Sequence, residues 1–190
     1  MTKNNKTIEE TKCWLKKIVI ENNFCPFAAK PFMENRIRYF VSESQTDKAL
    51  VDDIIEELIL LKNSDVKEIE TSLIIVPNCL EDFDSYNQFL SIVDEIVMSL
   101  NLEGDIQVAS FHPQYCFADL DVDDVRNYSN RSLYPMFHLI REESVSRAAV
   151  TYPDLHEIPE RNQKQLLSMG LTSLKQQLSK CCVDELEKNT

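Results

Sequence analysis

The chain has 190 residues, of which 43% are hydrophobic and 27% are charged, and its formal net charge is -12. This length predicts one soluble domain, residues 1–190, that buries enough surface to fold without disulfide bonds. The sequence holds only two glycines, Gly104 and Gly170. That excludes the glycine-rich phosphate loops of dinucleotide-binding and P-loop proteins, which neither residue can build.

The negative charge is concentrated in one part of the chain. Residues 43–103 hold 15 acidic residues and 3 lysines, which accounts for the whole net charge, and all seven arginines lie outside this segment. A solvated acidic helix face is the usual cause of such a run. No basic stripe is present to displace the counterions of a nucleic acid, so we expect no nucleic-acid partner.

The cysteines predict reduced thiols and a cytoplasmic protein. Six occur, and none forms a C-x-x-C pair, so a zinc knuckle is not indicated. The first residues contain no apolar signal core, and no apolar run is long enough to cross a bilayer, so we expect no membrane partner.

The first 64 residues predict a helix, a strand and a second helix. A capping box from Thr7 to Glu10 begins the first helix, which continues with apolar residues at helical spacing. Residues 36–42 alternate like a strand, and residues 46–64 have the period of an amphipathic helix.

The rest of the chain predicts two further strands, a long loop and more helices. Residues 71–77 form an apolar strand, residues 85–100 a helix that starts with a capping box at Ser85, and residues 105–113 a third strand. Residues 114–135 are irregular, with one helical turn near 123–128. Helices follow over 144–150 and 155–169, and Gly170 ends the second of them before a polar helical tail, residues 171–190.

Residues 136–142 fit either a fourth strand or the start of a helix, and we favour the strand. As a strand it places His138 and Arg141 on opposite faces, whereas as a helix it places them on one face.

This order predicts an α/β fold: a single-domain layered sheet with a β-α-β-α-β core, residues about 7–170, and parallel crossovers. In such sheets ligands bind beyond the carboxyl ends of the strands. His112, at the end of the third strand, and the long loop after it lie at this edge.

His112 and His138 are the candidate acid-base residues, although a lone histidine is more often structural. Cys25 precedes Pro26, and a helix that began there would have the cysteine as its N-cap, where a thiol pKa is lowered. The alternatives are a buried inert cysteine and a nucleophile that uses His112 or His138 as its base.

The arginines are the candidate ligand-binding residues, since their planar guanidinium groups suit carboxylate and phosphate. The alternative is that acidic side chains of the same chain neutralise them. The full candidate set is Arg36, Arg38, Tyr115, Asn130, Arg131, Ser132 and Arg141.

No metal site is expected. Residues 119–124, "DLDVDD", lack the turn glycine and the closing glutamate of an EF-hand, and a Mg²⁺ site at Asp119 with Asp123 or Asp124 is weakly signalled.

Five motifs resemble one bacterial and plant-plastid family, catalogued as domain of unknown function 1415. They are "NFCPFAAKPF", "RIRY", "QVASFHPQYCFAD", "NYSNRSLYPMFHLIRE" and "ERN…LLSMG". The resemblance runs from about Trp14 to Gly170, and the family typically has proline where Leu133 stands. It implies no activity, cofactor or substrate.

Three functions remain open at this stage. The first is a cytoplasmic enzyme, a hydrolase or transferase, that holds a small anionic metabolite by its arginines and uses His112, His138 and Cys25. The second is a non-catalytic ligand-binding or regulatory module with the same pocket. The third is a protein-interaction domain whose acidic helices meet a basic partner. The cofactor and the oligomeric state stay unknown.

Overall fold

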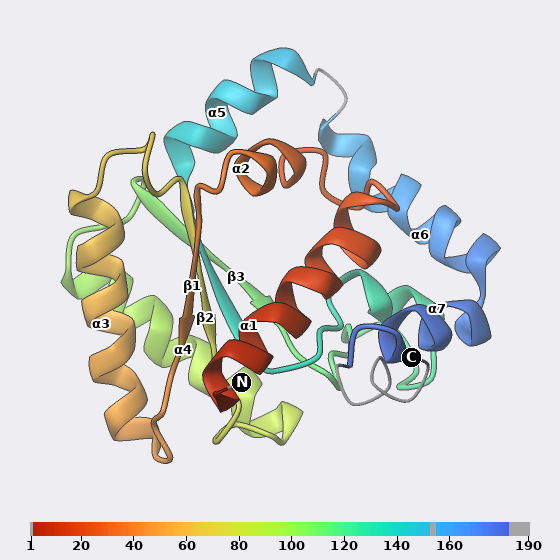
Figure 1. Cartoon of the computed structure of the whole chain (residues 1–190), viewed down its shortest axis with the longest axis horizontal. Coiled ribbons are helices and arrows are strands. Elements are labelled where there is room, and N and C mark those ends of the chain that lie inside the picture. Colours follow the sequence, from red (N-terminus) through yellow and green to blue (C-terminus); the bar gives the residue numbers. More distant parts are fainter. Residues whose placement is uncertain (1, 153–154, 183–190) are drawn as a thin grey trace.

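A computed structural model describes residues 2–152 and 155–182 of the chain. These residues form a layered α/β structure (Figure 1). The helices are α1 Lys3–Trp14, η1 (a π-helix) Leu15–Ile20, α2 Ala29–Met33, α3 Asp47–Asn63, α4 Phe83–Ser99, η2 (a 3-10 helix) Val125–Ser129, α5 Glu142–Thr151, η3 (3-10) Leu155–Glu157, α6 Ile158–Met169 and α7 Leu171–Ser179. The strands are β1 Ile37–Val41, β2 Thr71–Ile75, β3 Ile106–Phe111 and β4 Met136–Arg141.

Over the described ranges the strands pair in the order β1-β2-β4-β3. β1 and β2 are parallel, and β4 is antiparallel to both β2 and β3. The three strands of the predicted β-α-β-α-β core therefore point in the same direction, but β2 and β3 are not neighbours. The chain returns through residues 112–135 and places β4 between them, which confirms that residues 136–141 are a strand.

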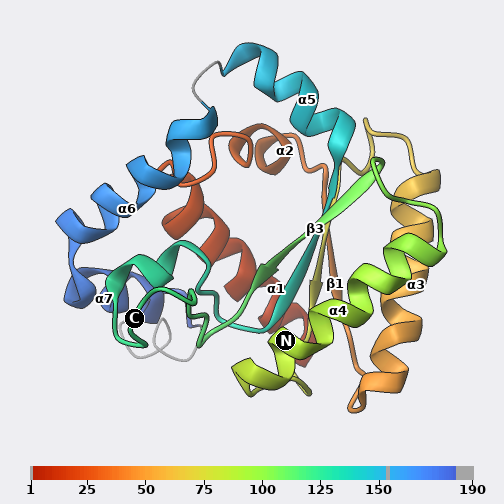
Figure 2. The same ribbon diagram turned by 180° about the vertical axis from the view of Figure 1, so that it is seen from behind.

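Helices cover both faces of the sheet (Figures 1 and 2). α3 and α4 pack on one face, around Ile54, Val93 and Phe137, all of which are buried. α1, η1, α6 and α7 pack on the other, around Trp14 and Met136. Each strand divides its side chains between these two cores because successive residues point to opposite faces.

The predicted helices are present, but three of them begin earlier than expected: α1, α4 and α5, which begins at Glu142 and not at residue 144. α1 begins at Lys3, because the Thr2 hydroxyl accepts the N–H of Asn5, and not at Thr7. α4 begins at Phe83, because the carboxylate of Asp82 accepts the N–H of Ser85 at 2.8 Å. In α1 and α4 an acceptor three to five residues upstream of the predicted cap satisfies one free N–H group of the first turn.

Two other local predictions agree with the structure. The loop after β3 contains the expected turn of helix, η2. Gly170 ends α6 with φ +73°, a left-handed conformation that glycine adopts without the steric cost of a Cβ atom.

The segment after Gly170 belongs to the packed structure. Leu174 of α7 is fully buried in the core that contains Trp14, and Cys181 is fully buried as well. The predicted polar tail thus contributes buried side chains to the fold as far as Cys181, and the part of that prediction over residues 183–190 lies outside the described residues. Across the described part of the chain, no helix has both the length and the apolar character needed to cross a membrane.

Leu174→Ala should lower the free energy of unfolding by about 3 kcal/mol, because it removes buried methyl groups and leaves a cavity. Leu167→Ala is the matched control, since Leu167 on α6 is 59% exposed, and it should change stability by less than about 0.5 kcal/mol. Urea unfolding of both variants measures the difference. Equal small effects would mean that α7 does not stabilise the fold.

Candidate functional site

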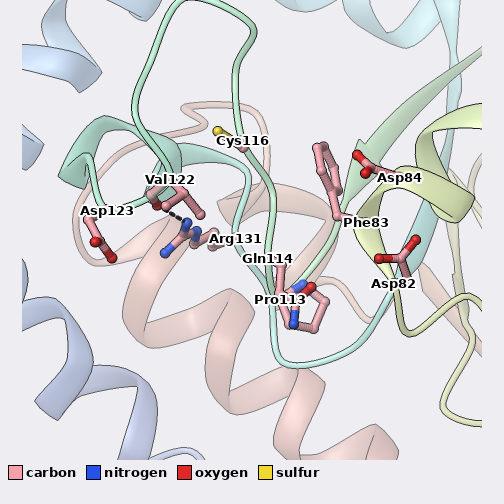
Figure 3. Close-up of a pocket in the computed structure, with 9 residues that line it drawn as sticks. All are labelled: Asp82, Phe83, Asp84, Pro113, Gln114, Cys116, Val122, Asp123 and Arg131. Atoms are coloured by element: carbon pink, nitrogen blue, oxygen red, sulfur yellow. Dashed lines mark hydrogen bonds between the residues drawn. The ribbon is translucent and has the colours of Figure 1, made fainter.

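A shallow pocket lies at the carboxyl edge of the sheet, where the sequence predicts ligand binding (Figure 3). Its volume is about 460 Å³, and its lining includes Arg131 and three carboxylates, with Asp123 on the same side as Arg131 and Asp82 and Asp84 on the other. Three carboxylate groups and one guanidinium group line this pocket, so its lining has a net negative charge. The pocket is therefore a poor match for an anionic ligand.

Arg131 uses its guanidinium group to fold the loop after β3. Its Nε donates to Tyr115 O at 3.1 Å, its Nη2 donates to Val122 O at 2.6 Å (Figure 3), and its cationic carbon lies 4.8 Å from the centre of the Tyr128 ring. Asn130 donates to Ser110 O at 3.2 Å. The polar side chains that suggested a ligand site thus satisfy the loop's own backbone.

Ser132 and His112 have similar structural contacts. The Ser132 hydroxyl donates to Tyr134 O at 2.6 Å. His112 is fully buried; Nδ1 accepts the N–H of Gln114 at 3.0 Å, and Nε2 lies 3.0 Å from Leu80 O. This pattern requires the proton on Nε2, and burial lowers the pKa of the imidazole. Both ring nitrogens are occupied, and His112 lies in neither of the two cavities described in this section.

The other three candidate arginines are also held by the protein. Arg36 pairs with Glu34 and, at 2.6 Å, with Glu70. The Arg38 guanidinium binds the buried Glu57 carboxylate through Nε at 2.8 Å and Nη2 at 2.7 Å. These pairs follow the second alternative for the arginines, in which acidic side chains of the same chain neutralise them.

Arg141 caps α3 from β4. Its Nη2 donates to the carbonyl oxygens of Leu61 and Ser64, the second at 2.8 Å, and also to Ile69 O at 3.2 Å. Leu61 lies in the last turn of α3 and Ser64 is its C-cap, and a cation at a helix C-terminus is favourable. Arg141 therefore lies on the α3 face of the sheet, opposite to His138, as the strand prediction required.

A larger cavity, of about 550 Å³, lies on the other face of the sheet, and we call it the His138 cavity. The elements that enclose it are α1 and η1, residues 25–31, the sheet and α5. It lies near the first residues of β1 and β2, at the end of the sheet opposite to the predicted edge. Most of its lining is apolar, including Trp14, Val19, Phe27, Leu73, Phe111 and Val145.

His138 projects into this cavity from the middle of β4. Its Nε2 lies 2.7 Å from the hydroxyl oxygen of Thr71, at the start of β2, and that hydroxyl lies 2.6 Å from Leu139 O. Burial lowers the pKa of His138 to about 4, so the imidazole is neutral at pH 7. The site therefore holds an uncharged histidine in an apolar environment.

Cys25 lines the same cavity, although 113 positions separate it from His138. It does not cap a helix: Cys25 to Ala28 form a turn, and α2 begins only at Ala29. Burial raises the pKa of the Cys25 thiol, while the N–H groups of Phe27 and Ala28 and the charge of Arg161 lower it. The net effect is a raised pKa, so the resting sulfur is a thiol.

The turn that carries Cys25 is fixed by α6. The Asn162 side chain donates to Phe24 O at 2.7 Å from a buried position, and Arg161 donates to Asn23 O at 2.6 Å. These two bonds hold the segment just before Cys25 and so fix where the thiol meets the cavity.

Charged groups lie at the mouth of the His138 cavity. Lys30 is exposed there, and Arg147 pairs with Glu143 at 2.9 Å and lies 3.9 Å from Glu70. Glu70 is also held by Arg36. Lys30 and Arg147 thus give the lining two cations against the single carboxylate of Glu70.

The structure therefore brings together two of the predicted residues, Cys25 and His138, and distributes the others elsewhere. Six polar residues of the cavity lining were missed: Thr71, Lys30 and Arg147, and also Glu70, Gln107 and Ser144. Thr71 lies in an apolar strand, and Lys30 and Arg147 are ordinary surface cations by sequence, so only the packing of the elements identifies these three. Within residues 2–152 and 155–182, no group of three or more metal-ligating side chains is positioned to hold an ion.

The comparisons with known proteins identify a family. Residues 6–176 match the profile of a family described as protein of unknown function (DUF1415), and because this is most of the sequence, the chain belongs to that family. No curated protein and no solved structure gives a significant match. The resemblance noted from the sequence motifs is confirmed.

His138 should make the fold less stable in acid. Its folded pKa of about 4 lies below the ordinary value near 6.5, so the unfolded chain binds the proton first as the pH falls. This contribution to stability is complete above about pH 6.5, and up to roughly 3 kcal/mol of it is lost between pH 6.5 and pH 4.

Urea unfolding at several pH values should show a shallower acid dependence in His138→Gln than in the wild type. His156→Gln is the control, because His156 is exposed and its removal should leave the pH dependence unchanged. Identical pH curves for the wild type and His138→Gln would contradict the lowered pKa of His138.

Proposed function

We propose that this protein binds a small acidic molecule with an apolar body in the His138 cavity. The observation that carries the proposal is that Cys25 and His138, which are distant in sequence, line one mainly apolar cavity. Ligand sites typically have volumes of 300 to 1,000 Å³ with few polar groups, and this cavity of about 550 Å³ fits that description. The six free cysteines suit the reducing cytoplasm, which we include in the proposal.

The charges at the mouth support an acidic end group on the ligand. Lys30 reaches the lining from α2, with its side chain exposed to solvent, and Arg147 reaches it from α5. A carboxylate or phosphate near Lys30 would gain a charged hydrogen bond. The anion expected from the sequence is thus retained in the proposal, but Lys30 and Arg147 replace the four arginines as its partners.

Catalysis is the second candidate function, because a thiol and an imidazole share the cavity. In a hydrolase or transferase, Cys25 would be the nucleophile and His138 the base that takes its proton. The resting pKa values oppose this transfer: burial raises that of Cys25 and lowers that of His138. We therefore rank binding first and treat chemistry as an additional property to be tested.

Binding of 2-naphthoate, a flat apolar acid, should raise the melting temperature of the wild-type protein, because a ligand of the native state stabilises it by mass action. Val145→Trp should abolish the shift by filling the cavity from α5. Val150→Trp is the control on the same helix, since Val150 is 85% exposed, and it should leave the shift intact. Lys30→Gln should weaken binding several-fold.

An equal shift in Val145→Trp and in the wild type would place the naphthoate outside the cavity and contradict the proposal. An unchanged melting temperature of the wild-type protein at millimolar 2-naphthoate would also contradict the proposal.

A reactive ester tests the catalytic candidate. With 6-acetoxy-2-naphthoate, the Cys25 sulfur would attack the acetyl carbon, the bond to the naphthol oxygen would break, and the thiol proton would pass through His138 to that oxygen. Mass spectrometry should then find an acetyl group on Cys25, absent in Cys25→Ser and strongly reduced in His138→Gln. Binding of the ester without any acetylation or release of naphthol would leave the protein as a binding module.

A further inference from the structure

We propose that the ligand of the His138 cavity presents a hydrogen-bond donor, a hydroxyl or an N–H group, to Nδ1 of His138, and that Thr71 sets this preference. The inference rests on the proposed function, because it names the ligand class of the same cavity. It adds a specificity that neither the sequence motifs nor the family assigns.

The hydroxyl of Thr71 determines which nitrogen of His138 carries the proton. A hydroxyl has one proton, and Leu139 O, which lies 2.6 Å from Thr71 Oγ1, is able only to accept a hydrogen bond. The Thr71 proton therefore points to Leu139 O, and the oxygen accepts from His138 Nε2 at 2.7 Å. Both bonds form only when Nε2 is protonated and Nδ1 is bare.

Nδ1 is then a hydrogen-bond acceptor in the cavity wall. In the described residues no hydrogen bond to Nδ1 is found, whereas His112 in the same chain has both nitrogens occupied. Because His138 lines the cavity, a donor on the ligand can bond to Nδ1, whereas a ligand without a donor leaves this acceptor without a partner, which costs free energy. A ligand with a hydroxyl or N–H group at this point is favoured over one with a methyl or ether group of similar size.

The pairing of β2 with β4 fixes the position of Thr71 relative to His138. β2 and β4 are antiparallel neighbours, with Thr71 opposite Ile140 and Leu73 opposite His138. Thr71 and His138 are therefore diagonal neighbours on the cavity face, a separation that side chains bridge readily. Because both residues lie within paired strands and not in loops, the acceptor is fixed before any ligand arrives.

The walls restrict the ligand further. Trp14 and Phe111 meet edge to face in the lining, with ring centroids 5.4 Å apart, and Lys30 lies at the mouth. Aromatic walls favour a flat body. The ligand class is therefore a flat apolar acid that carries a hydroxyl or amine substituent away from its acidic group.

Three probes of one shape test the donor: 2-naphthoate, 6-hydroxy-2-naphthoate and 6-methoxy-2-naphthoate. Calorimetric titration of the wild type should find the hydroxy compound bound about tenfold more tightly than either of the others, which is the effect of about one hydrogen bond. Equal affinities for the three acids would overturn the inference and leave the proposed function standing. No binding of any of them would overturn the proposed function itself.

Two substitutions test Thr71 as the positioning residue. Thr71→Ser keeps the hydroxyl and should keep the tenfold preference. Thr71→Val removes the acceptor for Nε2, so the ring becomes free to protonate Nδ1, and the hydroxy and methoxy acids should then bind within about twofold of each other. A tenfold preference that survives in Thr71→Val would remove Thr71 from the mechanism.

The tautomer is also directly measurable, independently of whether Thr71→Val folds. Nitrogen NMR of the wild-type protein, with His138→Gln to assign the signals, distinguishes a bare ring nitrogen from a protonated one. A bare Nδ1 and a protonated Nε2 at neutral pH are expected for His138. A protonated Nδ1 would overturn the inference.

Discussion

The structure depends on the insertion of β4 between β2 and β3. Because β4 is antiparallel to both neighbours, it must start at the edge of the sheet where β3 ends, so residues 112–135 stay at that edge and turn back. The same register places His138 opposite Leu73 and next to Thr71 on the cavity face. One strand pairing therefore accounts for the folded loop, the position of the histidine and the orientation of Arg141 toward α3.

The arginines illustrate how this acidic chain uses its positive charge. Arg36 and Arg38 bind glutamates, and Arg131 and Arg141 bind backbone carbonyls in the loop and at the end of α3. A buried carboxylate such as Glu57 is costly unless a cation accompanies it, and an uncapped helix end is costly unless a donor reaches it. Both the pairing of buried carboxylates and the capping of helix ends are requirements of the fold. An arginine-rich motif is therefore weak support for a ligand site in a chain that must neutralise its own acidic groups.

Local patterns predict much of this fold, whereas the candidate site depends on long-range packing. α3, Asp47–Asn63, agrees closely with the helix predicted over residues 46–64, because its apolar period acts within a few residues. The order of the strands and the cavity arise from contacts between segments far apart in the chain, such as the turn at Cys25 and β4. No sequence pattern marks Thr71 as a site residue. Its hydroxyl lies in an apolar strand, and it contacts His138 and Leu139 O only because β4 pairs with β2.

The burial that makes the His138 cavity suitable for binding also limits its chemistry. Desolvation keeps His138 neutral, as an acceptor, and keeps Cys25 protonated, as a poor nucleophile. An acidic ligand close to the sulfur would raise the thiol pKa further, because like charges disfavour each other. The amide N–H groups of Phe27 and Ala28 and the charge of Arg161 act in the opposite direction. Reaction at Cys25 therefore requires a ligand that holds its charge toward Lys30 and its uncharged, electrophilic part toward the turn.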